Sequence, residues 1–453
     1  MDTSQNKEFL ATAPIGRLLR KLAVPTVLAQ LVNMCYNIVD RIYIGRMPEV
    51  GDLALTGVGL CMPIILIVSA FAALFSGGAP RASIFMGQRR MDDAEAAMGG
   101  CFAMQIVASV VLTAALLLWN RDFLMAFGGS PYTIGYAVDY MNLYAVGTIF
   151  VQLTLGMNAF IAAQGFTRTA MCSVVIGAAC NIVLDPLFIY VLGMGVRGAA
   201  LATVISQTAS CIWVLSFLFG KKTNLRLRWR NIRLRPRVVL PCVALGTASF
   251  IMQSSESIVS MCFNASLQRY GGDIAVGAMT ILTAVMQFAM LPLQGLGQGA
   301  QPILSYNYGA GNKQRVKEAF FCLLKVSLGY SLFLCALVEL FPQLFVGLFT
   351  PDPALTAFAS RALRIYMGGV SIFGLQVACQ MAFLSFGKAL SSITVAVVRK
   401  FILLLPLIYL MPRFVEDKTM GVYLAEPVAD VLAVCFTGVL FFFQFRKVLR
   451  EMK

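Results

Sequence analysis

The sequence predicts an all-α integral membrane protein with twelve transmembrane helices in two pseudo-symmetric six-helix bundles. Its 453 residues are 59% hydrophobic and 13% charged, and the mean hydropathy is +0.79. Average soluble chains carry about twice that charged fraction. Two further observations support this fold class: apolar runs long enough to cross a bilayer recur along the chain, and the second half repeats landmarks of the first.

The apolar runs define the expected helices one by one. Each run is separated from the next by a short polar break, and a spanning helix needs roughly 20 mostly apolar residues. The expected helices are 22–44, 53–75, 94–119, 132–162, 169–192, 198–219, 238–267, 274–306, 319–341, 354–386, 390–410 and 421–445.

The distribution of basic residues predicts the orientation of these helices. An even number of spans places both termini on one side, and that side carries 24 Lys and Arg residues against 9 on the other. Because basic residues concentrate in cytoplasmic loops, both termini are expected in the cytoplasm. The first apolar run is long enough to span and lacks a small-residue cleavage site, so we expect no cleavable signal peptide.

The chain repeats itself with an offset of 222 residues. That offset takes Pro80 to Pro302 and Gly87 to Gly309, while near the start of each half an offset of 216 takes Pro25 to Pro241. Six helices per half give both halves the same orientation, which predicts a parallel repeat. The expected parts are an N-terminal bundle (1–220), a basic cytoplasmic linker (221–236) and a C-terminal bundle (237–453). The stretch 221–237 has eight basic and no acidic residues, and we expect it to lie on anionic membrane lipid and not to bind nucleic acid.

The composition also excludes several kinds of chemistry. The chain has no His, which excludes His-based proton relays, Ser–His or Cys–His nucleophiles and the usual His-containing zinc sites. Its 12 Cys are scattered without a C-x-x-C pair and are expected to be small buried hydrophobic residues. We therefore expect neither an enzyme nor a cofactor, and any proton must be carried by carboxylates.

Acidic residues in two predicted helices are the main functional candidates. An ionisable group in the hydrocarbon zone costs about 2.5 to 3.5 kcal/mol, so each is a functional hypothesis. In the first helix a polar stripe ends at an acid, with the members Gln30, Asn33, Asn37 and Asp40 on one face. The offset of 216 takes Asp40 to Glu256, which follows Gln253 in the seventh helix. The alternative is that each acid is a buried structural partner of a nearby base.

A second acid predicts an ion site in the N-terminal bundle. Asn181 and Asp185 are four residues apart and share a helical face. With Asp40, Asn158 and Thr203, they are expected to form an all-oxygen cluster that takes a proton, or a Na⁺ ion held by Asp40, Asn181, Asp185 and Thr203. Two carboxylates in a low dielectric cannot easily both stay charged, so one of them is expected to take up a proton or a cation readily. A coupling site requires this property.

The remaining candidates concern substrate binding and ion pairing. The expected substrate-binding residues are Glu256, Gln253, Asn37, Tyr140, Met286, Met290 and Gln287. Methionine stripes are usually core, but soft, repackable side chains also suit the wall of a cavity for varied apolar cations. Arg399 and Lys400 are expected near Glu426 and Asp430, where structural ion pairing is the plainer interpretation.

The sequence resembles the multidrug and toxic compound extrusion (MATE) family of secondary transporters over almost its whole length. The resemblance is carried by 22–25, 37–40, 181–186, 198–203 and 254–256, together with the Pro80/Pro302 and Gly87/Gly309 repeats. It implies the MATE fold, alternating access, and export of cationic or amphipathic drugs in exchange for H⁺ or Na⁺. Asp40, Asn181, Asp185 and Thr203 look like the cation site of the DinF-like branch, and having Glu256 as well is similar to MepA-like exporters.

One departure from the family pattern stands out. Branches with the acid of the seventh helix often add an acid on the tenth, whereas 366–380 contains no carboxylate. This weakens the case for a second, independent ion site in the C-terminal bundle.

The sequence hypothesis is a monomeric multidrug antiporter whose partners are small cationic drugs and membrane lipid. A lipid-linked oligosaccharide flippase of the same superfamily is the alternative, and it predicts several Arg or Lys side chains lining the cavity to hold pyrophosphate. A major facilitator carrier would show its Gly-Asp and Arg-rich loop signature, which 86–93 lacks. A membrane-embedded enzyme has no use for the two pseudo-symmetric acids.

Overall fold

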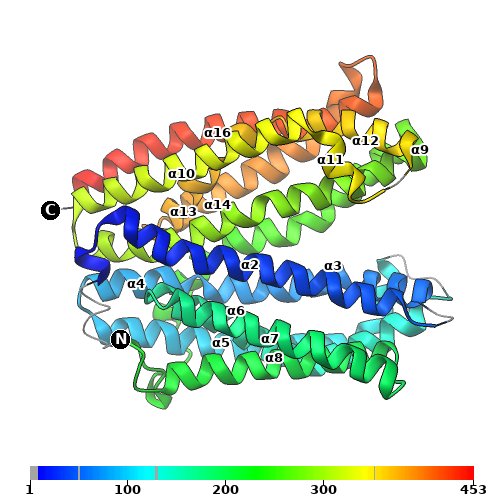
Figure 1. Cartoon of the computed structure of the whole chain (residues 1–453). Helices are drawn as coiled ribbons and strands as arrows, with labels where there is room; N and C mark the ends of the chain where they lie inside the picture. Colours follow the sequence, from blue (N-terminus) through cyan, green and yellow to red (C-terminus); the bar gives the residue numbers. More distant parts are fainter. Residues whose placement is uncertain (1–8, 49–50, 128–130, 351, 453) are drawn as a thin grey trace.

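The computed structural model describes residues 9–48, 51–127, 131–350 and 352–452, and this part of the chain is helical apart from its turns and connecting segments. Figure 1 shows two groups of helices, which we call the first lobe (α2 to α8) and the second lobe (α9 to α16). Both ends of the described chain lie together, because Leu10 and Met452 belong to the same hydrophobic cluster. We call this the terminal end of the molecule and the opposite side the distal end.

The first lobe contains six spans. Its elements are α2 (Ile15–Gly45), α3 (Gly51–Ser76) with α4 (Gly78–Gly87), α5 (Met91–Ala126), α6 (Ile134–Ala163), α7 (Thr167–Pro186) with the π-helical turn η1 (Leu187–Val191), and α8 (Val196–Phe219). The sequence left 78–87 as a break between helices, but the structure makes it the helix α4, which extends the second span toward the terminal end.

The second lobe also contains six spans. Its elements are α9 (Pro236–Gly309), α10 (Lys313–Leu340), α11 (Pro342–Gly347), α12 (Pro353–Tyr366), α13 (Val370–Ser385), α14 (Ala389–Val397), the π-helical turn η3 (Val398–Leu404), α15 (Leu405–Leu410), the short turn η4 (Met411–Arg413) and α16 (Lys418–Glu451). At 74 residues, α9 is far longer than the roughly 20 residues that cross a bilayer, and its backbone leaves the helical region at Gly272 (φ 62°). Its two halves are the predicted helices 238–267 and 274–306.

Two predicted helices of the second lobe prove to be interrupted. The expected single helix 354–386 is the pair α12 and α13, bent by 47°. The bend falls between Tyr366 and Val370, at Gly368 and Gly369. Glycine has a low helix propensity, so two adjacent glycines favour a break in the helix here. The expected helix 390–410 contains the π-helical turn η3, which carries Arg399 and Lys400.

The lobes touch near the terminal end and diverge toward the distal end (Figure 1). Thr26 Oγ1 of α2 donates a hydrogen bond to the Gly295 carbonyl of α9 (2.6 Å), and Gln30 Nε2 donates to Gln298 Oε1 (3.2 Å). The rings of Phe71 and Phe250 also pack across the boundary, with centroids 5.1 Å apart. Farther along both helices, Asn33, Glu256 and Ser260 are exposed. The structure is therefore a two-lobed body closed at its terminal end.

Close backbone approach at the terminal end depends on glycine. A methyl group on Gly246 of α9 would overlap the backbone of Leu74 in α3. The helices can approach this closely only because position 246 has no side chain.

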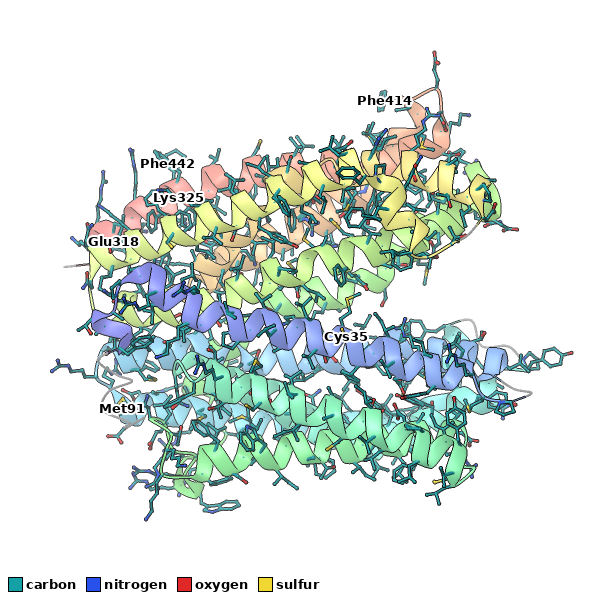
Figure 2. The ribbon with its side chains drawn as sticks, in the orientation of Figure 1. Cys35, Met91, Glu318, Lys325, Phe414 and Phe442 are labelled. Atoms are coloured by element: carbon teal, nitrogen blue, oxygen red, sulfur yellow. The ribbon has the colours of Figure 1, made fainter. Side chains whose placement is uncertain are left out.

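We expect Gly246→Val to separate the lobes at the terminal end, because the larger side chain cannot be placed without moving α3. The measurement is the distance between spin labels at Arg168, exposed at the start of α7, and Glu318, exposed near the start of α10 (Figure 2), in a variant without the 12 native cysteines. Gly329→Val, where added atoms meet open space, is the control. An unchanged label distance in Gly246→Val would contradict the prediction.

The linker between the lobes is held against the first lobe. Gln164 Oε1 accepts hydrogen bonds from Thr223 Oγ1 (2.8 Å) and from the backbone N–H groups of Asn224 and Leu225 (2.9 and 2.8 Å). Glu95 accepts from the backbone N–H of Arg226 (3.1 Å). Glu95 also forms an ion pair with Arg228. The linker is thus docked on protein, while Trp229 and the arginines that follow it remain exposed.

We expect Glu95→Gln to loosen the linker, because the buried carboxylate loses its charge and with it the ion pair to Arg228. Limited digestion with trypsin should then cleave the 226–237 stretch several-fold faster than in the wild type. Glu318→Gln, at an exposed site on α10, should leave the cleavage rate unchanged. Equal rates in all three proteins would show that Glu95 does not hold the linker.

Candidate ion and substrate site

Asp40 and Asp185 meet inside the first lobe. Asp40 lies in α2 and Asp185 near the end of α7, and their side chains are close enough to share a hydrogen bond. Both residues are buried. Among the described residues, neither carboxylate forms an ion pair with Lys or Arg, and Asp40 Oδ1 and Asp185 Oδ2 have no hydrogen-bond partner. Two buried carboxyl groups without an ion pair require a proton or a cation.

The local structure of α7 positions Asp185. Asn181 Nδ2, one turn earlier, donates to Asp185 Oδ1 (3.2 Å). Pro186 follows at once and lacks the N–H that would continue the helical hydrogen bonds, so the chain passes into the π-helical turn η1. Interruptions of this kind are frequent at functional sites.

A small chamber of about 40 Å³ lies beside Asn181, the residue that donates to Asp185, although neither Asp40 nor Asp185 lines it. Asn33 and Tyr36 line it from α2, Asn181 from α7, and Thr203 from α8. Thr203 also shares a hydrogen bond with the buried Tyr140 of α6. The volume is enough for a few water molecules. The structure therefore brings Asp40, Asn181, Asp185, Thr203 and Tyr140 into one region.

Asn158 does not join this region, which corrects the sequence prediction. Its Nδ2 donates to the carbonyl of Ala170 (3.2 Å), near the start of α7. Ala170 precedes Asp185 by fifteen residues, or about 22 Å along a helix. The sequence placed Asn158 on the correct helix but not at the correct depth in the membrane.

No set of three or more His, Cys, Asp or Glu side chains arranged to hold a metal ion occurs in the part of the chain that the structure describes. A cation at Asp40 and Asp185 would therefore rely on two carboxylates and on neutral oxygens such as those of Asn181 and Thr203. Hard oxygen ligands of this kind fit Na⁺ or a shared proton. They do not fit a transition metal, which prefers nitrogen and sulfur ligands.

The second lobe contains a paired charge cluster in place of uncompensated acids. Arg399 Nη2 lies 2.8 Å from Asp430 Oδ1 and 3.2 Å from Glu426 Oε1, and Arg399 Nε donates to Asp430 Oδ1 (2.9 Å). The Arg399 guanidinium also stacks on the ring of Phe373, 4.6 Å from its centroid. All three charged side chains are buried, as the ion-pairing interpretation of the sequence predicts.

Lys400 has a different partner from the one that the sequence analysis expected. Its Nζ lies 2.7 Å from Glu256 Oε1, so it is Glu256 that Lys400 pairs with directly. The Lys400 side chain is 4% exposed, whereas the Glu256 side chain is 55% exposed. Glu256 thus has the nearby base that the alternative interpretation required, yet more than half of its side chain remains exposed.

The other expected substrate residues are only partly gathered around Glu256. Gln253 lies one turn before Glu256 and is half-buried, Asn37 is half-buried on α2, and Gln287 is exposed on the second half of α9. Met286 and Met290, however, pack against the hydrophobic core of the second lobe. Their placement matches the core interpretation of the methionine stripe and does not bring them to the carboxylates.

The helices form two lobes. In the described part of the chain, one lobe buries acids without an ion pair, and the other has an exposed acid. This is the architecture of a secondary membrane transporter. The chain belongs to the MatE family, whose profile matches residues 25–187 and 248–410. The two matched segments are the same length, so the family profile reproduces the internal repeat, at an offset of 223 residues. Membership agrees with the resemblance seen in the sequence and with a transporter in place of an enzyme.

Known proteins resemble this chain over most of its length. It is 23% identical over 369 residues to a multidrug export protein, MepA, of Staphylococcus haemolyticus strain JCSC1435, covering 81% of this chain and 80% of that protein. The crystal structure of a MATE protein in the bent conformation superposes with a TM-score of 0.92 at 21% identity and covers 99% of both chains. An outward-facing multidrug resistance MATE transporter of the MOP superfamily gives 0.90 at 21% identity, covering 97% of this chain and 98% of that one.

We expect Arg399→Met to be strongly destabilising, because it leaves Glu426 and Asp430 buried without their counter-charge. Breaking a buried ion pair from one side costs about 3 to 5 kcal/mol. The check is the thermal unfolding of detergent-purified protein, with Lys325→Met as the control at an exposed position on α10. Equal midpoints for Arg399→Met and the wild type would contradict the structural role.

Proposed function

We propose that the protein is a secondary active antiporter that exports organic cations and amphipathic drugs in exchange for H⁺ or Na⁺. The observation that carries this proposal is that Asp40 and Asp185 are buried together and, among the described residues, neither forms an ion pair with Lys or Arg. A low-dielectric site of this kind favours the binding of positive charge. The name of the staphylococcal relative, a multidrug export protein, agrees with the proposed cargo.

Coupling arises if the ion and the drug favour different conformations. Asp40, Asp185, Asn181 and Thr203 bind the incoming H⁺ or Na⁺, and neutralising the acids changes the free-energy difference between the two states of the lobes. A ligand shifts such an equilibrium only by the difference between its affinities for the two states. The chamber supports the proposal because it provides room for water next to Asn181, the hydrogen-bond partner of Asp185.

The drug binds between the lobes, beside Glu256. Gln253 and Asn37 lie half-buried on the helices that face this space, and Gln287 is exposed on the second half of α9. Tyr140 belongs to the wall of the ion site, through its hydrogen bond with Thr203. An exposed carboxylate among neutral polar side chains suits the binding of single cations with varied apolar parts.

The terminal end lies in the cytoplasm, and the distal opening faces outward. The excess of Lys and Arg at the terminal end supports this orientation. The protein works as a monomer in the bacterial plasma membrane, because the ion site and the drug site both lie within one chain. Its parts are the bundles 1–220 and 237–453, joined by the linker 221–236.

The flippase alternative is less well supported. A pyrophosphate group calls for free Arg or Lys side chains. Arg399 and Lys400, the buried bases of the second lobe, are already bound to carboxylates.

We expect Asp40→Asn and Asp185→Asn to abolish gradient-driven efflux of a cationic dye such as ethidium from proteoliposomes, because an amide cannot exchange a proton or attract Na⁺. The loss should be at least about tenfold, as for other coupled sites. Asp139→Asn removes an exposed acid of α6 that pairs with Arg197, and it should retain transport.

The driving ion follows from the same assay. A pH gradient without sodium and a sodium gradient at constant pH are imposed separately on the wild type. If both Asn variants keep full efflux under whichever gradient drives the wild type, Asp40 and Asp185 are not the coupling site.

A further inference from the structure

Lys400 and Glu256 form an ion pair whose two members differ sharply in exposure. The Lys400 side chain is 4% exposed, whereas the Glu256 side chain is 55% exposed. Lys400 Nζ lies 2.7 Å from Glu256 Oε1. An exposed carboxylate remains accessible to a second cation. A buried ammonium group, in contrast, must always have an acceptor, because burying it alone is very costly.

Lys400 has a second acceptor nearby, the carboxylate of Glu426. Glu426 lies within electrostatic range of Lys400, and it is only singly bonded by Arg399 (3.2 Å). Asp430 Oδ2 is buried without a hydrogen-bond partner. The cluster thus contains three carboxylates, Glu256, Glu426 and Asp430, against two bases. If Lys400 leaves Glu256, it does not become an unpaired buried charge.

The internal repeat shows that Lys400 has no charged counterpart in the first lobe. The offset of 222 takes Ala178 of α7, which lines the small chamber of the first lobe, to Lys400. The offset of 216 takes Asp40 to Glu256. Where the first lobe leaves room for an ion from solution, the second lobe has a lysine of its own.

We propose that Lys400 is a tethered cation that competes with the transported organic cation for Glu256. When the substrate binds Glu256, the Lys400 ammonium moves toward Glu426; when the substrate leaves, it returns. This competition lowers substrate affinity and promotes release. The second lobe then needs no coupling ion, and only Asp40 and Asp185 exchange one with the solution. The inference rests on the proposed function, because it assumes a cationic substrate.

The position of Lys400 on η3 fits this movement. In a π-helical turn the hydrogen bonds span five residues, and the backbone is wider than in an α-helix. The long lysine side chain has four rotatable bonds and a compact charge with no fixed geometry. A buried arginine held by two bonds, such as Arg399, is much less free to exchange partners.

The test is equilibrium binding of tetraphenylphosphonium to the purified full-length protein in detergent at one pH. Lys400→Gln should raise the affinity about tenfold, because the internal competitor is removed. Glu256→Gln should lower the affinity, and Glu256→Gln/Lys400→Gln should match Glu256→Gln alone. Lys325→Gln, on the outer side of α10 (Figure 2), is the control and should bind like the wild type.

Lys400→Arg provides a second test in case Lys400→Gln does not fold. A guanidinium can bind Glu256 through two hydrogen bonds and is harder to displace, so the affinity should fall several-fold while folding is preserved.

The outcomes separate the inference from the proposed function. If the wild type binds tetraphenylphosphonium and both Lys400 variants bind it equally well, Lys400 is a structural partner and the inference is wrong, while the proposed function stands. If the wild type binds neither tetraphenylphosphonium nor ethidium, the proposed function fails and the inference fails with it. Higher affinity in Lys400→Gln that requires Glu256 supports the inference, because a purely structural pair gives no such gain.

Discussion

The rest of the structure depends on one constraint, the cost of holding negative charge in an interior that has no water to solvate it. The two lobes meet that cost differently. Asp40 and Asp185 are buried together without an ion pair to any described Lys or Arg, and each retains a carboxylate oxygen without a hydrogen-bond partner. In the second lobe Arg399 and Lys400 provide the counter-charges to Glu426, Asp430 and Glu256. The first lobe therefore leaves its acids for the H⁺ or Na⁺ of the proposed function, whereas the second lobe already contains its own cations.

Much of the fold and part of the site could be predicted from the sequence. The spans follow from the length of the apolar runs, and the polar stripe ending at Asp40 together with the repeat identifies Glu256. Asn181 and Asp185 share a face because four residues make about one helical turn. These features are local or follow from symmetry, and both kinds of information are present in a single chain.

What the sequence could not predict depends on helix depth and on breaks in helices. Asn158 lies on the expected helix but about 22 Å along α7 from Asp185, because periodicity gives the face of a helix and not its depth. Lys400 was assigned to the acids of α16, yet its partner is on α9. Lys400 lies in the π-helical turn η3, an interruption that periodicity does not reveal, and its pairing with α9 depends on how the helices pack.

The distribution of charges also determines how readily the lobes can move. Among the described residues, every ion pair lies within one lobe or joins the linker to the first lobe. The lobes meet at the terminal end through apolar side chains that α2 buries against α9 and α10, through the hydrogen bonds of Thr26 and Gln30, and through the packing of Phe71 on Phe250. Arg315 of α10 also donates hydrogen bonds to the carbonyls of Leu10 and Ala13. Each such hydrogen bond contributes about 1 kcal/mol, and reversing a population from 1:99 to 99:1 takes about 5.5 kcal/mol. Under the proposed function, an ion at Asp40 and Asp185 has to shift the balance between two states by an amount of this order. Among the described residues no ion pair between the lobes adds to the cost of opening, but the apolar side chains that α2 buries against the second lobe, such as Leu18 and Leu22, do add to it.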